Sequence, residues 1–335
     1  MRSVTILGAG SWGTTLAIHL SQNGYDVSLW EFRRDVADRL RDDRENVDLL
    51  PGISIPDRIH ISSVLKDTVS PRVEMLVFAV PSHVLREVAH KVAPLISDVP
   101  FVVSVVKGIE NGTFKRMSEV LEEELPGIFR ARIAVLSGPS HAEEVSREIP
   151  TSVVVASGDP EVAVAVQRTF LSPRFRVYTN EDMVGVELAG ALKNIIAIAA
   201  GISDGLGFGD NTKGALLTRG LAEITRLGIA MGAKASTFSG LSGIGDLITT
   251  CLSRYSRNRY VGEEIGKGKS LSHVLDRMAM VAEGVMTTKA TYQLARHYNV
   301  EMPITNEVYA VLFQDKDPAQ AVADLMTRTA KAETW

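Results

Sequence analysis

The chain has 335 residues, and 45% of them are hydrophobic, which suffices for two domains with separate cores. A net charge of −4 argues against a nucleic-acid-binding protein that depends on a broadly basic surface. The single cysteine, Cys251, excludes an intramolecular disulfide and agrees with a reducing compartment.

The first residues show no targeting-signal pattern, because glycines at positions 8, 10 and 13 interrupt the early apolar run. The strongest candidate for a membrane span, residues 184–202, contains Glu187 and Lys193. Two ionisable groups within this stretch favour a helix buried in protein over a membrane span. We therefore expect a cytoplasmic protein without a membrane span.

Strand and helix patterns alternate in the first half of the chain. Apolar runs that end in glycine, proline or polar residues occur at residues 3–7, 27–30, 75–80, 101–106 and 133–136. Between them lie helical patterns such as residues 14–22 and 115–125. This alternation predicts an α/β fold with a Rossmann-like, doubly wound, mostly parallel sheet. Two further β-rich runs, residues 152–156 and 175–178, flank a helical pattern at 160–171 and should extend the same sheet.

Strand patterns stop after Asp182, and the remaining periodicity is helical. Helices are predicted at residues 184–202, 213–231, 260–266, 272–279, 287–297 and 304–313. An all-helical C-terminal domain should therefore follow the sheet. We expect residues 1–184 to form a dinucleotide-binding domain and residues 185–335 a helical substrate and catalytic domain.

A glycine-rich segment, Gly8-Ala9-Gly10-Ser11-Trp12-Gly13, follows the first predicted strand and opens the first helix. In this position the G-x-G-x-x-G pattern is typical of dinucleotide binding. Gly8 permits the tight turn, Gly10 lets the pyrophosphate approach the backbone, and Gly13 lets the helix pack closely on the strand. The helix then presents its free N–H groups to the phosphates.

The second strand ends in Trp30-Glu31-Phe32-Arg33-Arg34, close to where the cofactor's ribose should bind. An acid such as Glu31 would hold the ribose hydroxyls of NADH, whereas Arg33 and Arg34 would accommodate the 2′-phosphate of NADPH. The alternative is that these residues form an exposed helix start. Between the two cofactors, the sequence gives only a slight preference for NADPH.

A basic cluster, Ser253-Arg254-Tyr255-Ser256-Arg257-Asn258-Arg259, combines three arginines with serine and asparagine donors. These groups suit a phosphate dianion, although a charge run is often only a solvated surface. The neighbouring glycine, serine and asparagine residues favour a shaped phosphate-binding loop. Cys251 lies close by but has no histidine motif with it, so we expect a buried thiol rather than a nucleophile.

Lys193 lies in the most apolar predicted helix, where its neighbours one turn away are Ala189, Gly190, Ile196 and Ala197. A lysine on such a face needs a counter-charge, or its pKa falls. Asp246, on the turn Gly243-Ile244-Gly245-Asp246, is the partner we expect. The pair could serve as general acid or base in carbonyl reduction, or it could be a purely structural buried ion pair.

Two polar segments, Lys107-Gly108 and Gly138-Pro139-Ser140, follow predicted strands. Ligands of open α/β sheets bind at the carboxyl ends of the strands. Lys107 and Ser140 are therefore candidate substrate contacts, although a lysine at such an edge can also be merely solvated.

Taken together, these residues closely resemble the bacterial type of NAD(P)-dependent glycerol-3-phosphate dehydrogenase. The matching segments follow one another over nearly the whole chain: GAGSWGT at 8–14, VVKGIE at 105–110, LSGPSHA at 136–142, ELAGALKN at 187–194, GLSGIGDL at 240–247, SRNR at 256–259 and VAEG at 281–284. The chain departs from the family pattern at Glu31-Phe32, directly after Trp30.

The resemblance implies that Lys193 donates or accepts the proton. It implies substrate contacts from Lys107, Gly138, Ser140, Lys193, Asp246, Ser256, Arg257 and Asn258. The implied cofactor contacts, which include the three glycines of the fingerprint, are Gly8, Gly10, Ser11, Trp12, Gly13, Arg33, Arg34, Lys107, Ala142, Arg257, Val281 and Glu283. No metal site is implied.

Such an enzyme would reversibly reduce dihydroxyacetone phosphate to sn-glycerol 3-phosphate with NAD(P)H and supply the glycerophospholipid backbone. The apolar helical domain makes a homodimer the expected assembly. Two alternatives stay open: a related 3-hydroxyacid or 6-phosphogluconate dehydrogenase, and a non-catalytic NADP-sensing protein of the same fold. The Arg257 cluster disfavours a 3-hydroxyacid substrate, and the sensor would have little use for Lys193.

Overall fold

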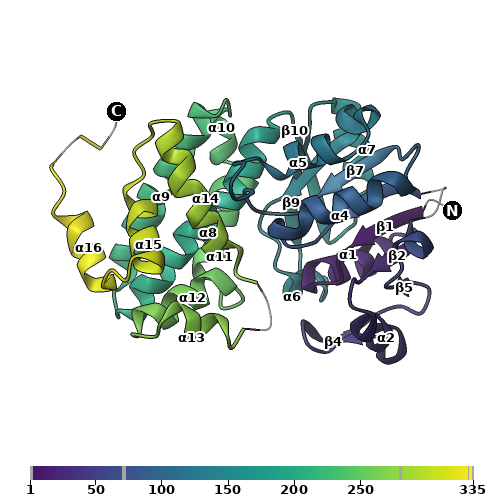
Figure 1. The fold of residues 1–335 in the computed structure, drawn as a ribbon, viewed down its shortest axis with the longest axis horizontal. Helices are drawn as coiled ribbons and strands as arrows, with labels where there is room; N and C mark the ends of the chain where they lie inside the picture. The colour runs from purple at the N-terminus through teal and green to yellow at the C-terminus, as the bar shows by residue number, and fades with distance from the viewer. Residues whose placement is uncertain (1–2, 70–72, 279–280, 331, 334–335) are drawn as a thin grey trace.

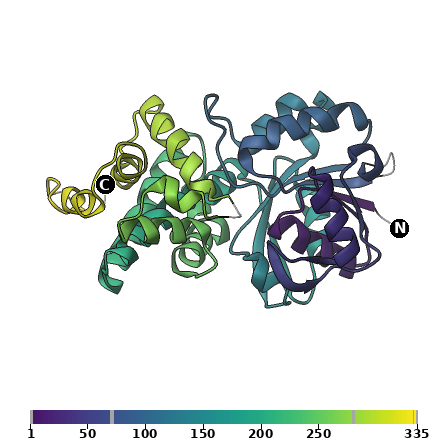
Figure 2. The same ribbon diagram turned by 60° about the horizontal axis from the view of Figure 1, so that its bottom comes forward.

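The computed structural model describes residues 3–69, 73–278, 281–330 and 332–333. A sheet with its covering helices forms one end of the molecule, and a group of helices forms the other (Figure 1). A view turned by 60° shows the same two parts lying side by side (Figure 2).

The sheet has eight strands in the order β10-β9-β8-β7-β6-β1-β2-β5. All neighbours are parallel except β8 and β9, which are antiparallel. The strands are β1 (Ser3–Leu7), β2 (Asp26–Trp30), β5 (His60–Ser62), β6 (Val73–Phe78), β7 (Phe101–Ser104), β8 (Ile133–Ser137), β9 (Thr151–Ser157) and β10 (Phe175–Asn180). A separate ribbon pairs β3 (Glu45–Asn46) with β4 (Leu50–Ser54).

Helices cover both faces of this sheet, which confirms the predicted doubly wound fold. One face packs against α1 (Ser11–Gln22), α2 (Arg34–Asp43) and α7 (Pro160–Phe170). The other packs against α4 (Leu85–Val92) and α5 (Met117–Glu124). Shorter elements are α3 (Leu65–Thr68), α6 (Ala142–Val145) and the 3₁₀ turns at Ser82–Val84, Ala93–Leu95 and Gly127–Arg132.

The second part is helical, as predicted, and is built around α8 (Met183–Gly205). Its other helices are α9 (Asp210–Ala230), α10 (Ala235–Phe238), α11 (Asp246–Leu252), α12 (Arg257–Gly266), α13 (Leu271–Leu275), α14 (Glu283–His297), α15 (Pro303–Phe313) and α16 (Pro318–Met326). A π-type turn at Leu241–Gly245 precedes α11. The division of the chain after residue 184 stays a prediction.

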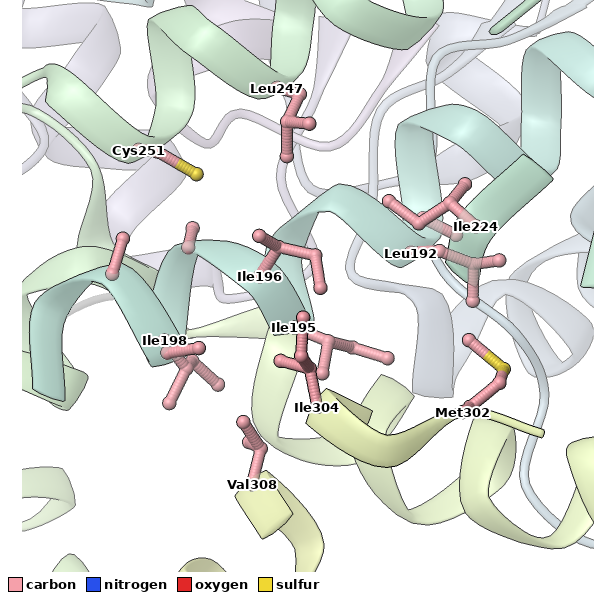
Figure 3. Close-up of a cluster of buried hydrophobic side chains, with 14 of the residues drawn as sticks. Leu192, Ile195, Ile196, Ile198, Ile224, Leu247, Cys251, Met302, Ile304 and Val308 are labelled. Carbon is pink, nitrogen blue, oxygen red and sulfur yellow. The ribbon is translucent and has the colours of Figure 1, made fainter. Parts of the chain in front are cut away.

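Helix α8 is the core of the helical part. By length and composition it could cross a membrane, but 78% of its most apolar window is buried inside the protein. Leu192 and Ile196 of α8 pack with apolar side chains of α9, α11 and α15 (Figure 3). Cys251 lies in the same cluster, and burial raises the pKa of its thiol to about 12. The expected buried thiol is thus confirmed.

The structure departs from the predicted elements in several places. Helices α10, α11 and α16 were not predicted, and α14 begins at Glu283, four residues before the predicted start. Strands β3, β4 and β5 were not predicted, because β3 and β5 are very short and β4 contains proline and glycine. The helix predicted at 272–279 is α13, which ends at Leu275, and residue 279 lies outside the described residues. The helix predicted at 260–266 begins earlier, at Arg257, because the Ser256 side chain caps it by accepting a hydrogen bond from the N–H of Arg259.

Helices α8 and α12 approach so closely that only glycine fits where they cross. A Cβ atom at Gly201 would lie 1.9 Å from the carbonyl oxygen of Arg259, and one at Gly262 would lie 1.9 Å from that of Ile198. Closely packed backbones cannot easily move aside for such an atom. The crossing therefore fixes the start of α12 relative to Lys193 on α8.

Gly201→Ala is expected to destabilise the protein by about 1–3 kcal/mol, because the added methyl group forces the two helices apart. Gly214→Ala is the matched control: Gly214 is also within a helix, but a Cβ atom there would have open space around it. That change should leave the unfolding temperature unchanged or raise it slightly. Thermal unfolding checks both variants, and equal unfolding temperatures would show that the crossing tolerates a side chain.

Candidate active site

A cleft of about 620 Å³ lies where the sheet meets the helical part. The glycine-rich loop, the end of β2 and the segments after β6, β7 and β8 line one side of it. Residues of α8, α11 and the start of α12 line the other side. The cleft thus lies at the carboxyl ends of the parallel strands, where ligands of such sheets bind.

The glycine-rich loop has the backbone that a dinucleotide requires. Gly8 has φ +111°, a left-handed value that favours glycine, and a Cβ atom at Gly13 would lie 1.9 Å from the Gly8 carbonyl oxygen. Gly10 faces open space, and no side chain caps the N-terminus of α1. The first N–H groups of α1 are therefore available to a pyrophosphate, so the loop fits NAD(P).

Asn46 supports this loop from behind. Its buried Nδ2 atom donates hydrogen bonds to the carbonyl oxygen of Ala9 and to Thr14 Oγ1, both at 2.9 Å. The β3–β4 ribbon is thereby tied to the cofactor loop. Our interpretation of the sequence missed this contact, because Asn46 lies outside the glycine pattern.

Asp246 lies between two lysines. Its Oδ1 atom is 2.8 Å from Lys193 Nζ, and its Oδ2 atom is 2.7 Å from Lys107 Nζ. Lys193 also donates to Thr250 Oγ1 at 2.5 Å, and Lys107 donates to the carbonyl oxygen of Gly138 at 3.0 Å. The expected pairing of Lys193 with Asp246 is confirmed, and Lys107 is part of the same buried network.

This network determines the pKa of Lys193. Burial is the largest influence on the pKa of Lys193 and lowers it to about 8; Asp246 opposes this effect and Lys107 adds to it. Burial alone would raise the pKa of Asp246, but Lys107 and Lys193 outweigh it, so the pKa lies below its usual value. Near neutral pH, Asp246 is therefore ionised while Lys193 can both give and take a proton.

The turn before α11 positions Asp246. A Cβ atom at Gly243 would lie 2.0 Å from the carbonyl oxygen of Phe238, so the chain can fold back on itself here only with glycine. Asp246 is then the first residue of α11, and Thr250 follows one turn later on the same face. Both side chains consequently point to Lys193.

The basic cluster does not form the loop that we expected. Arg257 and Asn258 lie in the first turn of α12, which Ser256 caps. Arg259 is instead held by Asp204, with nitrogen–oxygen distances of 2.6 and 2.7 Å, and the Arg254 guanidinium lies over the ring of Tyr255. The three arginines thus separate, because successive helical residues point in different directions.

Of these arginines, Arg257 faces the cleft. Its side chain is accessible to solvent, yet desolvation by the surrounding protein lowers the pKa of its guanidinium. The charges of Glu283 and Glu143 oppose this effect. Among the described residues, none forms a hydrogen bond or an ion pair with its guanidinium. Arg257 therefore presents an unpaired cation beside the N-terminus of α12, where an anion is favoured.

At the cofactor end of the cleft, Glu31 and Arg33 interact with each other. The buried Oε1 atom of Glu31 accepts hydrogen bonds from the backbone N–H of Arg33 at 3.2 Å and from its Nε at 3.3 Å. Arg33 lines the cleft. Arg34, whose side chain is 88% exposed, lies near Asp38 on α2 and does not line the cleft.

Glu283 joins the two parts of the molecule. Its Oε1 atom accepts a hydrogen bond from the Ser82 N–H at 3.0 Å, and its Oε2 atom accepts one from Ser82 Oγ at 2.5 Å. Ser82 follows β6, whereas Glu283 begins α14. These two hydrogen bonds therefore connect the sheet part to the helical part beside the cleft.

The structure brings most predicted site residues to this one cleft. Those that line it are Gly8, Gly10, Ser11, Trp12, Arg33, Lys107, Ser140, Ala142, Lys193, Asp246, Ser256, Arg257, Asn258, Val281 and Glu283. Gly13, Arg34 and Gly138 do not line it, although Gly138 accepts the Lys107 hydrogen bond. Seven further polar residues line it that sequence reasoning missed: His83, Glu87, Lys91, His141, Glu143, Asn194 and Thr250. Only Thr250 had a usable signal, its spacing of four residues from Asp246.

A sheet with a glycine-rich dinucleotide loop, a helical second part and a buried Lys193–Asp246 pair in the cleft between them are typical of nicotinamide-dependent dehydrogenases. Comparison with known proteins identifies the family within this class. Models of the N-terminal and C-terminal parts of NAD-dependent glycerol-3-phosphate dehydrogenase match residues 3–163 and 182–323. The chain belongs to this family and is an NAD(P)-dependent oxidoreductase of the glycerol-3-phosphate dehydrogenase type.

Relatives match over their full length. The glycerol-3-phosphate dehydrogenase [NAD(P)+] of Chlorobium limicola is 55% identical, over 99% of this chain and 99% of the relative. That of Salinibacter ruber is 52% identical, over 99% and 96%. The crystal structure of glycerol-3-phosphate dehydrogenase from Coxiella burnetii superposes with a TM-score of 0.92 at 38% identity, covering 98% of this chain and 99% of that one.

Proposed function

We propose that the protein reversibly reduces dihydroxyacetone phosphate to sn-glycerol 3-phosphate with NADPH or NADH, and that Lys193 is the general acid and base. The proposal rests chiefly on Lys193 Nζ, held 2.8 Å from Asp246 in a cleft that also contains the glycine-rich loop. A carbonyl oxygen placed against Lys193 would be within reach of a proton donor whose pKa is about 8.

In the reducing direction, a reduced nicotinamide cofactor held by the glycine-rich loop would supply the hydride that the C2 carbonyl carbon needs. Protonated Lys193 gives its proton to the oxygen as negative charge develops there, and a hydroxyl group results. Asp246 remains ionised and holds the Lys193 ammonium in place, while Lys107 adds a second positive charge beside the same carboxylate. In the oxidising direction, neutral Lys193 takes the proton from the hydroxyl group.

The substrate phosphate is assigned to the start of α12. Arg257 supplies an unpaired guanidinium, and the Nδ2 group of Asn258 can donate because its Oδ1 already accepts from the N–H of Gly284 at 2.9 Å. The hydroxyl of Ser256, whose oxygen caps α12, can still donate its proton. Ser140 and Lys107 on the opposite wall would contact the glycerol portion.

For the cofactor, we favour NADPH, bound through Arg33. Replacing Arg33 with glutamine should weaken NADPH binding by about tenfold or more and NADH binding much less, since only NADPH has the 2′-phosphate. Arg34→Gln is the control, because Arg34 lies outside the cleft. Equal losses for both cofactors in Arg33→Gln would contradict this role and would favour Glu31 as a ribose contact.

Four wider assignments accompany this function. We infer that residues 1–184 bind the dinucleotide and residues 185–335 supply most of the substrate contacts. We also infer a cytoplasmic homodimer that provides the glycerol backbone of phospholipids. The single cysteine, which is buried and not in a disulfide, supports a reducing compartment.

The direct test of the function is a product assay. Purified protein with NADPH and dihydroxyacetone phosphate should form sn-glycerol 3-phosphate in step with NADPH oxidation. A 3-hydroxyacid and 6-phosphogluconate, each tested with oxidised cofactor, should give no reaction. Turnover of either in place of glycerol 3-phosphate would replace the proposal, and cofactor binding without any turnover would favour a sensor.

A further inference from the structure

One polar side chain in the cleft has no role in the mechanism above. His141 follows β8 and lies just before α6, with its ring beside that of Tyr255 at a centroid distance of 5.9 Å. Lys193, Asp246 and Lys107 are the charged groups that act on it. His141 therefore lies between the reacting centre and Tyr255, which precedes α12 by two residues.

The two ring nitrogens of His141 have different surroundings. The backbone of Thr249 acts on the ring, whereas the buried Nε2 atom has no hydrogen-bond partner among the described residues. We assign the ring proton to Nδ1, so that Nε2 presents a lone pair. Burial, followed by Lys193, lowers the pKa of His141 to about 4 despite the opposing effect of Asp246, so the ring is neutral near neutral pH.

A buried acceptor without a partner is costly unless a ligand supplies a donor. The charged groups that act on His141 are either donors or already paired. Lys193 and Lys107 can only donate as ammonium groups, and both carboxylate oxygens of Asp246 are already paired with them. Glu143, also in the cleft wall, acts on Arg257 at the phosphate end.

We propose that His141 is a specificity-determining residue whose Nε2 atom accepts a hydrogen bond from the terminal hydroxyl group of the substrate. This inference rests on the proposed function, because that hydroxyl is the donor which dihydroxyacetone phosphate has at the end opposite its phosphate. The bond selects a hydroxymethyl ketone over a methyl ketone. A site built to bond a hydroxyl discriminates against the analogue that lacks it, since its own polar group is then left unpaired.

The test pairs two variants with two substrates. His141→Asn keeps a donor near the Nδ1 position for Thr249 but removes the acceptor at Nε2. His141→Gln places an amide oxygen near the Nε2 position. The substrates are dihydroxyacetone phosphate and acetol phosphate, in which the terminal hydroxyl is replaced by hydrogen. Competitive inhibition by acetol phosphate gives the same comparison where its turnover is slow.

The wild-type enzyme should prefer dihydroxyacetone phosphate in kcat/KM, and His141→Asn should reduce that preference by about tenfold or more, with little change for acetol phosphate. His141→Gln should restore most of the preference. An equal loss for both ketones in His141→Asn would overturn the proposal and assign His141 a structural role. Failure of the wild-type enzyme to use or bind either ketone would instead refute the proposed function.

Discussion

Replacing Lys193 with methionine is expected to lower kcat by about 10²- to 10⁴-fold while the protein stays folded. The side chain is buried, and methionine preserves most of its length and its apolar contacts on α8. Asp246 would still pair with Lys107 at 2.7 Å, so no unpaired charge would be left in the interior. Stopped-flow or steady-state turnover with NADPH, beside thermal unfolding, measures both effects.

Lys193→Arg tests whether the positive charge alone is sufficient for turnover. Arginine keeps the positive charge beside Asp246 but does not release a proton near neutral pH, so it should also be nearly inactive. Near-normal turnover in Lys193→Met would refute the catalytic role. Loss of turnover only through unfolding would instead identify Lys193 as half of a structural ion pair.

Removing the phosphate from the substrate is expected to have a comparably large effect. Dihydroxyacetone should be reduced about 10³-fold less efficiently than dihydroxyacetone phosphate, since binding energy from the phosphate helps to organise the reacting carbonyl. Arg257→Met should reduce this advantage markedly, because its guanidinium faces the cleft without a hydrogen-bond or ion-pair partner among the described residues. Steady-state kcat/KM for both ketones in both enzymes measures the change.

Arg254 provides the matched control for charge. Arg254→Met removes one positive charge from the same short segment, but Arg254 lies over Tyr255 and does not line the cleft. Its kcat/KM for dihydroxyacetone phosphate should stay within about twofold of the wild-type value. Equal effects of the two substitutions would show that only the general charge of the segment matters.

Local patterns in the sequence predicted much of this arrangement. The glycine fingerprint depends on backbone conformation within six residues, and the structure places Gly8, Gly10 and Gly13 as the pattern requires. Lys193 was conspicuous because an ionisable group in an apolar helix needs a partner, and Asp246 is that partner. The first inference rests on local backbone geometry, and the second on the need of a buried charge for a counter-charge.

The features that were missed depend on tertiary contacts. The cap by Ser256 starts α12 three residues before the predicted position, and this sends Arg257 into the cleft while Asp204 holds Arg259 elsewhere. A cluster of arginines in the sequence does not show which member is already paired. The partnerless Nε2 atom of His141 likewise follows from packing against Tyr255 and Thr249, which sequence spacing does not show.

The pH dependence of the reaction in both directions tests the central role of Lys193 most directly. Ketone reduction needs protonated Lys193, so its rate should fall as the pH rises through about 8. Oxidation of sn-glycerol 3-phosphate needs neutral Lys193, so its rate should rise through the same pH. Opposite profiles with a shared midpoint near this value are the predicted result, whereas two profiles that are flat there, or that change in the same direction, would contradict the assignment.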